Sequence, residues 1–185
     1  DVLAIASSPS FDPNAFVPSL SHQAADTLYN HTGHPLVNRA AMGYYTPGSI
    51  FKPVVALAAL SADPSMADSR VHCPGYYKLG NGRIQCWLSG GHGEIAMEEA
   101  ISYSCNTFFC AISRRVGHEK IVDMARDLGL GNATGIHLSS ESLGLLPNAA
   151  WKREAHNEGW FEGDTCNLSI GQGPITVTPL QAALM

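Results

Sequence analysis

Residues 44–52 read Tyr-Tyr-Thr-Pro-Gly-Ser-Ile-Phe-Lys, which places a serine three residues before a lysine at the start of an apolar run. The Pro-Gly pair ends the preceding segment, and Ser49 stands where a helix over residues 50–60 would begin. Residues three apart share a helix face, so the Ser49 hydroxyl and the Lys52 amine are expected to meet. A lysine whose pKa is lowered by burial can take a serine proton, which makes the pair a candidate nucleophile and base. The same pattern also arises as a helix-capping serine beside a solvated lysine, so it does not decide the chemistry alone.

A second polar pattern, Ser104-Cys105-Asn106, follows 55 residues after Ser49, at the expected junction of two helices. In serine acyl-enzymes with a lysine base, a second serine relays the proton between the base and the leaving group. An asparagine amide two residues further on can hold both the lysine and the carbonyl of the substrate. Serine and asparagine are also favoured helix caps, so a purely structural role for Ser104 and Asn106 stays open at this point.

Three stretches taken together resemble the penicillin-binding proteins, and most closely their class B transpeptidases. They are Pro-Gly-Ser-Ile-Phe-Lys-Pro at 47–53, Ser-Cys-Asn at 104–106 and Ile-Gly-Gln-Gly-Pro at 170–174. The resemblance runs essentially end to end and is nearest to the elongation-type branch, penicillin-binding protein 2. It implies the α/β (α+β) serine acyl-transferase fold that the family shares with serine β-lactamases. In that fold a mainly antiparallel sheet packs between helices, and the helix that carries Ser49 is central.

The resemblance also implies that the chain is one incomplete domain. The third motif of the family, K-[ST]-G on an edge strand, is expected well beyond Met185. Residues 1–185 are therefore expected to be the N-terminal two thirds of a transpeptidase domain, without its pedestal, membrane anchor and K-[ST]-G segment. The chain has no initiator methionine, no signal-like segment and no run near the roughly 20 apolar residues that span a bilayer. By resemblance alone, the full protein is placed at the bacterial inner membrane, on its periplasmic face.

For function, the resemblance implies a peptidoglycan D,D-transpeptidase of cell elongation. Ser49 would attack the D-Ala–D-Ala bond of a stem peptide, with Lys52 as the base. Ser104 would relay the proton, Asn106 would position the substrate, and Ser49, Ser104 and Asn106 together would bind it. β-Lactam antibiotics imitate D-Ala–D-Ala and would acylate Ser49. The expected partners are stem peptides, β-lactams, a SEDS-type glycosyltransferase and other elongasome proteins; no catalytic cofactor and no nucleic acid are expected.

Two other kinds of function remain open from the sequence. One is a D,D-carboxypeptidase or β-lactamase of the same fold. A class A β-lactamase needs a deacylating glutamate, usually within E-x-x-L-N, and neither Glu141 nor Glu154 stands in that pattern. This favours slow hydrolysis, and hence a transpeptidase that penicillin traps. The other is a non-catalytic penicillin-binding-type scaffold or sensor. The intact set of Ser49, Lys52, Ser104 and Asn106 argues against that function.

Cys73, Cys86, His92 and Cys105 form a possible metal site, with 12, 5 and 12 residues between them. No pair makes a C-x-x-C knuckle, so spacing alone leaves a structural zinc, a Cys73–Cys86 disulfide and coincidence all open. Elongation-type penicillin-binding proteins carry a metal cluster with Asp, His and Cys ligands between their first two motifs. Its last ligand is the middle residue of the second motif, and by count from Ser49 the matching positions are these four. The resemblance therefore implies a structural zinc ion.

Composition restricts the class of protein further. The 185 residues are 45% hydrophobic and 15% charged, which suits a globular, loop-rich chain and excludes a coiled coil, collagen and general disorder. A formal net charge of −5 without a basic block gives no support for nucleic-acid binding. The five cysteines are odd in number, so at least one has no intrachain disulfide partner. Cys110 is expected in the core, and Cys166 has no evident partner.

Periodicity and capping residues predict the elements around these motifs. The expected elements are a strand over 2–7, helices over 50–60, 94–104, 107–116 and 118–128, and a helix that begins after a Thr178 cap. Residues 62–93 are rich in glycine, proline and aspartate and hold the spaced cysteines, and residues 130–165 are expected to be irregular.

Overall fold

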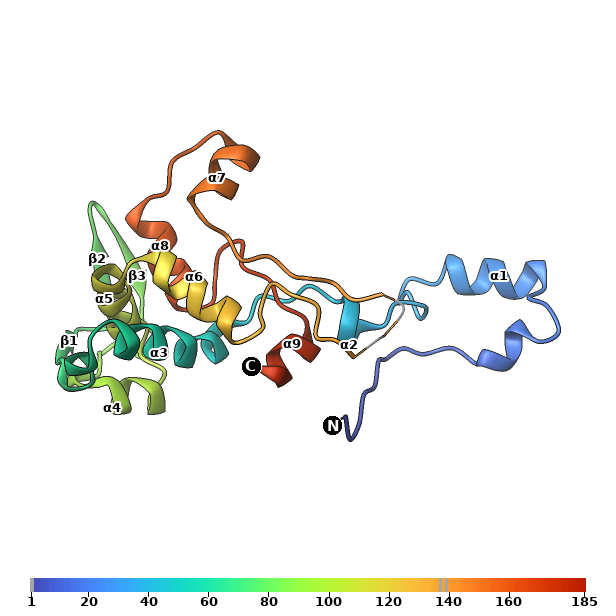
Figure 1. Cartoon of the computed structure of the whole chain (residues 1–185), viewed down its shortest axis with the longest axis horizontal. Helices are drawn as coiled ribbons and strands as arrows, with labels where there is room; N and C mark the ends of the chain where they lie inside the picture. The colour runs from blue at the N-terminus through green and yellow to red at the C-terminus, as the bar shows by residue number, and fades with distance from the viewer. Residues whose placement is uncertain (1, 137, 139) are drawn as a thin grey trace.

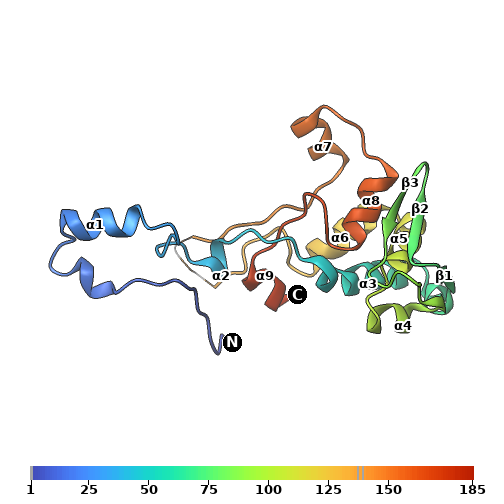
Figure 2. The same cartoon turned by 180° about the vertical axis from the view of Figure 1, so that it is seen from behind.

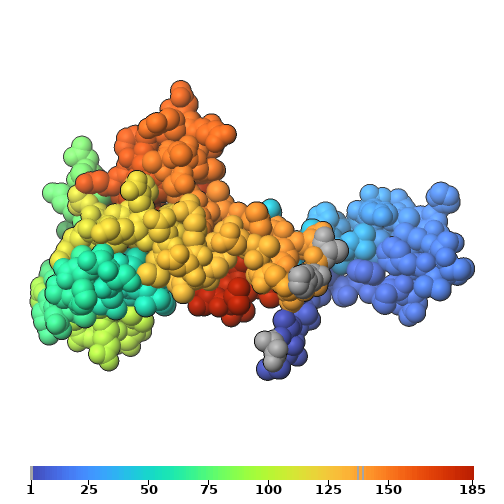
Figure 3. Space-filling model, viewed as in Figure 1, coloured from blue at the N-terminus to red at the C-terminus, as the bar shows by residue number. Residues whose placement is uncertain are grey.

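The computed structural model describes residues 2–136, 138 and 140–185. Its outline is elongated: the helices around Ser49 gather at one end, and an arm that carries α1 (His22–Tyr29) extends to the other (Figure 1, Figure 3). The arm also contains η1 (Pro13–Phe16), and neither of these two elements has a buried residue. The short helix α2 (Arg39–Met42) lies between the arm and the body (Figure 1). The candidate catalytic residues Ser49, Lys52, Ser104 and Asn106 all lie at the helical end.

The core is built on α3 (Lys52–Ala62), which follows the 3-10 turn η2 (Gly48–Phe51). α3 packs against α5 (Asn106–Val116) on one side and α6 (His118–Asp127) on another, so its apolar residues are buried in several directions. α8 (Glu162–Ser169) covers a further side of α5. The buried residues of α3 are Lys52, Val54, Val55, Ala56, Ala58 and Ala59. The helix thus carries one lysine into an apolar core.

The ends of α5 show why its sequence forms a separate helix. The Sγ of Cys105 accepts from the backbone N–H of Phe108 and caps the first turn. Phe108, Phe109 and Ile112 are fully buried on the core side. At the far end the chain leaves the helix through Gly117, which has φ 87°.

The β-structure consists of two antiparallel pairs among the described residues. β1 (Val71–Cys73) pairs with β4 (Gly93–Ile95) so that Cys73 stands opposite Gly93. β2 (Tyr76–Leu79) and β3 (Gly82–Gln85) form a hairpin that stands beside α5 (Figure 2). These pairings bring the cysteines of residues 73–86 next to the segment around His92.

The remaining described elements surround this core. They are the 3-10 helix η3 (Pro64–Asp68) and the helices α4 (Met97–Ser102), α7 (Ala149–His156) and α9 (Pro179–Leu184). Thr178 caps α9 in a capping box with Gln181, whose side chain also reaches the carbonyls of Asn132 and Leu143.

The structure confirms the predicted helices over 50–60, 107–116, 118–128 and after Thr178, and the fold class of helices around antiparallel β-structure. The strand predicted over 2–7 is wrong, because this segment pairs with no strand among the described residues. The helix predicted over 94–104 begins later, at Met97, because Gly93–Ile95 pair with β1. The stretch 130–165, expected to be irregular, contains α7 and the first half of α8, and the glycine-, proline- and aspartate-rich stretch 62–93 contains η3, β1, β2 and β3.

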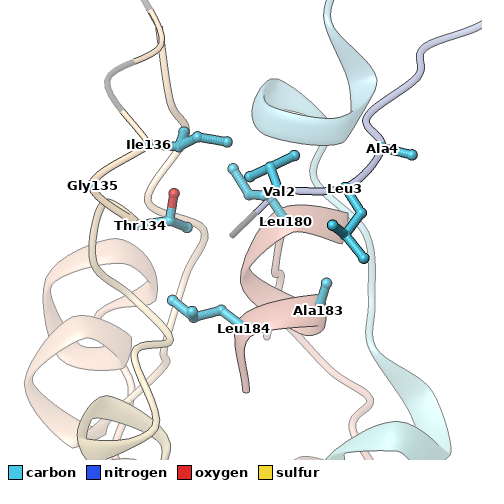
Figure 4. A pocket seen from close by; sticks show the side chains of 9 residues that line it. All are labelled: Val2, Leu3, Ala4, Thr134, Gly135, Ile136, Leu180, Ala183 and Leu184. Carbon is cyan, nitrogen blue, oxygen red and sulfur yellow. The ribbon is translucent and has the colours of Figure 1, made fainter.

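A cavity of about 600 Å³ lies between the N-terminal segment, residues 134–136 and α9 (Figure 4). Its lining residues are Val2, Leu3, Ala4, Thr134, Gly135, Ile136, Leu180, Ala183 and Leu184. None of them carries a charge, a thiol or an imidazole, and Thr134 supplies the one polar side chain. The lining of the cavity is mainly apolar, and none of its residues belongs to the site described next.

Candidate active site

Four side chains meet beside the start of α3. Ser49 lies exposed in η2, Lys52 opens α3, and Ser104 and Asn106 stand at the start of α5. The Nζ of Lys52 lies 3.1 Å from Ser49 Oγ, 2.8 Å from Ser104 Oγ and 2.8 Å from Asn106 Oδ1. The Oγ of Ser104 donates to the Oγ of Ser49 at 2.8 Å. All four candidate catalytic residues therefore form one hydrogen-bonded group.

Lys52 is almost completely buried, with 2% of its surface exposed. Burial lowers its pKa from the usual value of 10.5, while nearby thiols, led by Cys105, oppose that shift. Its Nζ also lies 2.7 Å from the carbonyl oxygen of Ser104. A neutral amine has two N–H donors, and the Ser104 carbonyl and Asn106 Oδ1 can accept both. The lone pair of the amine is then directed at a serine hydroxyl, as a general base requires.

The backbone at Ser104 arranges two sites at once. Ser104 has φ 53°, a left-handed conformation that costs a non-glycine residue about 1 kcal/mol. This turn between α4 and α5 lets Ser104 and Asn106 face Lys52, while the side chain of Cys105 between them is fully buried. The Nδ2 of Asn106 donates to the carbonyl of Gln85 at 3.0 Å, which fixes the amide from the end of β3.

The segment after α8 supports the loop that carries Ser49. The N–H of Gly48 donates to the carbonyl of Gly171 at 2.9 Å. Gly171 has φ +66°, and a Cβ there would lie 2.1 Å from the carbonyl oxygen of Gly48. Glycine is therefore required at position 171 by both its conformation and this close approach. The Ile-Gly-Gln-Gly-Pro stretch is thus part of the active-site framework.

A second cluster of side chains lies behind Ser104. The Sγ atoms of Cys73 and Cys86 are each 3.6 Å from His92 Nδ1, and the Sγ atoms of Cys86 and Cys105 are 3.9 Å apart. All four potential ligand atoms lie within 4.8 Å of one another. A tetrahedral zinc with ordinary Zn–S and Zn–N bonds places two sulfurs about 3.8 Å apart and a sulfur and nitrogen about 3.6 Å apart. The donor set and its spacing therefore fit a structural zinc ion.

The thiols of this cluster differ in acidity. Burial raises the pKa of Cys73, but hydrogen bonds from Thr107, from both the backbone and the side chain of His92, and from the backbone of Gly75 outweigh it and bring the value to about 6. Burial raises the pKa of Cys105 to about 12. All five cysteines of the chain are free thiols in the structure, so Cys73 and Cys86 are not joined.

Aromatic rings enclose the imidazole of this cluster. His92 lies 5.4 Å from the ring of Trp87 and stacks on Tyr103 at 6.0 Å, measured between ring centroids. The Nε1 of Trp87 donates to the carbonyl of Tyr103 at 2.8 Å. The Nε2 of His92 is buried and has no hydrogen-bond partner in the described part of the chain. The thiols of Cys73 and Cys86 at Nδ1 and the two rings therefore hold this imidazole, while its Nε2 stays unpaired among the described residues.

Two features of the site, and one contact outside it, could not be read from the sequence. The contact of Asn106 with the Gln85 carbonyl is a backbone contact and leaves no pattern in side-chain types. Gly171 belongs to the Ile-Gly-Gln-Gly-Pro motif, but its contact with Gly48 depends on the fold. Cys166 does have a neighbour: it packs against Cys110 across the α5–α8 interface.

The family model for the penicillin-binding protein transpeptidase domain matches residues 1–185. The chain belongs to the penicillin-binding protein transpeptidase family. The peptidoglycan D,D-transpeptidase MrdA of Acinetobacter baumannii is 39% identical over 186 residues, which cover 100% of this chain and 28% of that protein. These findings confirm the predicted family and its elongation-type branch.

Solved structures of the family share the fold of this chain. The crystal structure of penicillin-binding protein 2 of Pseudomonas aeruginosa in complex with WCK 5153 matches with a TM-score of 0.94 at 39% identity. That match covers 100% of this chain and 41% of the other. Penicillin-binding protein 2 of Helicobacter pylori in complex with MreC matches with a TM-score of 0.91 at 32% identity, over 96% of this chain and 33% of the other. The chain therefore spans less than half the length of these family members.

None of the described helices is both long and apolar enough to span a bilayer.

Proposed function

We propose that the full-length protein is a peptidoglycan D,D-transpeptidase of cell elongation that works through an acyl-enzyme on Ser49. The observation that supports this most is the buried Lys52 amine, which lies within 3.1 Å of the hydroxyls of both Ser49 and Ser104. Membership of the transpeptidase family points to the D-Ala–D-Ala end of a stem peptide as the substrate. β-Lactams, which imitate that end, would acylate the same serine.

In the first step, neutral Lys52 takes the proton of Ser49 as Oγ attacks the carbonyl carbon of the D-Ala–D-Ala bond. The two N–H groups of the amine meanwhile stay bonded to the Ser104 carbonyl and Asn106 Oδ1. The backbone N–H of Ser49 lies at a helix start, where N–H groups are free to stabilise the developing oxyanion. Ser104, which contacts both Lys52 and Ser49, passes the proton to the departing D-Ala amine.

In the second step, the amine of a neighbouring stem peptide attacks the acyl-enzyme and gives a 4-3 cross-link. The proton of that amine passes through Ser104 to Lys52, and Lys52 returns it to Ser49 Oγ as the bond between the acyl group and Oγ breaks. If water were the acceptor, the enzyme would instead be a carboxypeptidase. In the described part of the chain Lys52 is hydrogen-bonded to Ser49, Ser104 and Asn106, none of which is a glutamate that could activate such a water.

The test uses the full-length protein with a fluorescent penicillin and then with a stem peptide. Ser49→Ala should abolish covalent labelling and leave the thermal unfolding transition unchanged, whereas Ser19→Ala, a change at another exposed serine, should label like wild type. With a stem peptide and an amine acceptor, the cross-linked product should exceed free acid. Full acylation of Ser49→Ala would exclude Ser49 as the nucleophile, and free acid as sole product would favour the carboxypeptidase.

We also propose that Cys73, Cys86, His92 and Cys105 hold one structural zinc ion, with no catalytic cofactor elsewhere. The S···N and S···S distances of 3.6 Å and 3.9 Å support this assignment. Four protein ligands would leave no open position, so the ion would supply rigidity and no Lewis-acid chemistry. Elemental analysis should find about one zinc per chain in wild type and in Cys110→Ser, and none in Cys105→Ser. A metal-free wild type with a Cys73–Cys86 disulfide would exclude the site.

We further propose where the full-length protein acts. It would lie at the bacterial inner membrane, on the periplasmic face, where its substrates are stem peptides. Its partners would be a SEDS-type glycosyltransferase and other elongasome proteins, as fits the family. The relative from Helicobacter pylori was solved with MreC, which makes an MreC-type protein the first partner to test. Residues 1–185 would be the N-terminal two thirds of the transpeptidase domain, with K-[ST]-G in the segment that follows. Co-purification of the full-length protein from solubilised membranes tests the location and the partner together.

A further inference from the structure

Two buried thiols face each other where α5 and α8 pack together. Cys110 on α5 and Cys166 on α8 are 56 positions apart in the sequence, and both are 0% exposed. The thiol of Cys110 lies 3.8 Å from the carbonyl oxygen of Cys166, and the thiol of Cys166 lies 3.9 Å from the carbonyl oxygen of Cys110. Each sulfur therefore reaches across the interface to the backbone of the other cysteine.

The two helices carry the same local pattern at this crossing. On α5 the Oγ of Ser113 donates to the carbonyl of Cys110 at 3.0 Å. On α8 the Oγ of Ser169 donates to the carbonyl of Cys166 at 2.7 Å. Each serine follows its cysteine by three residues, so small polar side chains flank the thiols on both helices. The distances of 3.8 Å and 3.9 Å from each sulfur to the opposite carbonyl oxygen show that the two helices approach closely here, as a bond between the sulfurs requires.

The side chains also interact with each other. A hydrogen bond from the Cys110 thiol lowers the pKa of Cys166, against the effect of burial. The same bond, together with burial, raises the pKa of Cys110. Cys166 is therefore the sulfur that more readily becomes a thiolate, and Cys110 is the proton donor beside it.

We propose that Cys110 and Cys166 are a site of reversible disulfide formation that joins α5 to α8. The oxidant is a disulfide, either a protein thiol oxidase or oxidised glutathione. The Cys166 thiolate attacks one sulfur of the oxidant and releases the first thiol. Cys110 then attacks the sulfur of Cys166 in the mixed disulfide, and the second thiol leaves with the remaining proton. Two protein S–H bonds and one oxidant S–S bond become one protein S–S bond and two oxidant S–H bonds.

Burial decides when this reaction takes place. Because neither sulfur touches solvent, the oxidant reaches the pair before α8 packs on α5, or when α8 moves away. The three other cysteines are held in the cluster with His92 and are not part of this pair. The inference goes beyond the proposed function and does not depend on it.

The bond would act on the active-site framework. α5 begins at Asn106, and α8 is followed by Gly171, which contacts Gly48 beside Ser49. A covalent link between the two helices would hold these segments together when the rest of the chain loosens. The oxidised protein is therefore expected to resist unfolding more than the reduced protein, with the same contacts at Ser49.

The first experiment identifies the bond. Full-length protein folded with oxidised glutathione is unfolded in N-ethylmaleimide without reductant, digested and analysed by mass spectrometry. The expected product is a Cys110 peptide joined to a Cys166 peptide, which a reductant separates. Ala111→Ser, a serine change at the neighbouring position of α5, is the matched control and should keep the link, whereas Cys110→Ser should leave Cys166 alkylated. Alkylation of both cysteines in the wild type, or a link from either one to a different cysteine, would overturn the proposal.

The second experiment measures the consequence. Reduction should lower the apparent Tm of the oxidised wild type by about 5 °C, whereas a Cys110→Ala/Cys166→Ala variant should show no change on reduction. Because both arms keep the Cys73 cluster intact, an equal fall in the two proteins would assign the effect to that cluster and reject the pair. If the double variant does not fold, the mass spectrum of the wild type still decides.

Discussion

Replacing Gly171 by alanine is expected to slow the acylation of Ser49, although position 171 lies on a different segment. Gly171 has φ +66°, and its added Cβ would lie 2.1 Å from the carbonyl oxygen of Gly48 and 2.7 Å from its nitrogen. The left-handed conformation alone costs an alanine about 1 kcal/mol. The contact must also open by more than about 1 Å to reach a normal separation. Gly48 is bonded to Ser49, so the nucleophile moves with it.

A misplacement of about 1 Å lowers an enzymatic rate about 100-fold, which corresponds to about 2.7 kcal/mol in the barrier. Gly80→Ala is the matched control, because Gly80 has φ +55° and no atom within 4 Å of a built Cβ. The assay compares the acylation rate constant with a fluorescent penicillin, and urea unfolding, in full-length wild type and both variants. Both variants should lose about 1 kcal/mol or more of stability, and Gly171→Ala alone should acylate about 100-fold more slowly. Equal acylation rates in the two variants would refute the positioning role of Gly171.

Five further outcomes are expected. Lys52→Ala should lose penicillin labelling, because no other group at the site takes the Ser49 proton; labelling at the wild-type rate would exclude Lys52 as the base. Because burial lowers the pKa of Lys52, the wild-type acylation rate should rise with pH through a value below 10.5. Between that lowered pKa and 10.5, Lys52 carries a proton in the unfolded chain but not in the folded chain. The free energy of unfolding should therefore rise with pH across this window. Denaturant titrations of Lys52→Met should lack this rise. Cys105→Ser should lower the apparent Tm and slow labelling, since a structural zinc contributes on the order of 10 kcal/mol; an unchanged melt would contradict this. Residues 1–185 expressed alone should not hold penicillin durably, and stoichiometric, stable labelling of that piece would show that later segments are dispensable.

Only one pair of the candidate catalytic group leaves a local signal in the sequence. Ser49 and Lys52 are three residues apart at a helix start, and that spacing alone predicts their contact. Ser104 and Asn106 needed the family resemblance, because nothing local says that a segment 55 residues away folds back onto Lys52. The metal cluster also depended on the resemblance, since its ligands come from β1, the β3 end, the loop before β4 and the start of α5.

The elements that the sequence analysis misassigned depend on contacts that a local sequence pattern does not show. β1 and β4 are three residues each, too short for an alternating pattern to stand out, and they exist through pairing with each other. Residues 2–6 are a continuous apolar run, Val-Leu-Ala-Ile-Ala, yet an apolar stretch becomes a strand only where a partner supplies hydrogen bonds. α7 is an eight-residue helix with no buried residue, so its sequence has no apolar stripe that predicts a helix. Its capping residue Asn148 is the one local signal. The Asn148 cap was therefore the one signal from which α7 could have been predicted.

Residues 104–106 tie the catalytic group to the thiol cluster. Ser104 and Asn106 contact Lys52, while Cys105 between them contacts Cys86, so one short backbone segment serves both. The left-handed turn at Ser104 costs about 1 kcal/mol, and a bound zinc would exceed that cost about tenfold. If the ion binds as proposed, it is the largest single term that keeps the turn in place. The cluster then acts on catalysis through the position of two side chains, without contact with the substrate, and loss of the ion would slow acylation while Ser49 itself stayed intact.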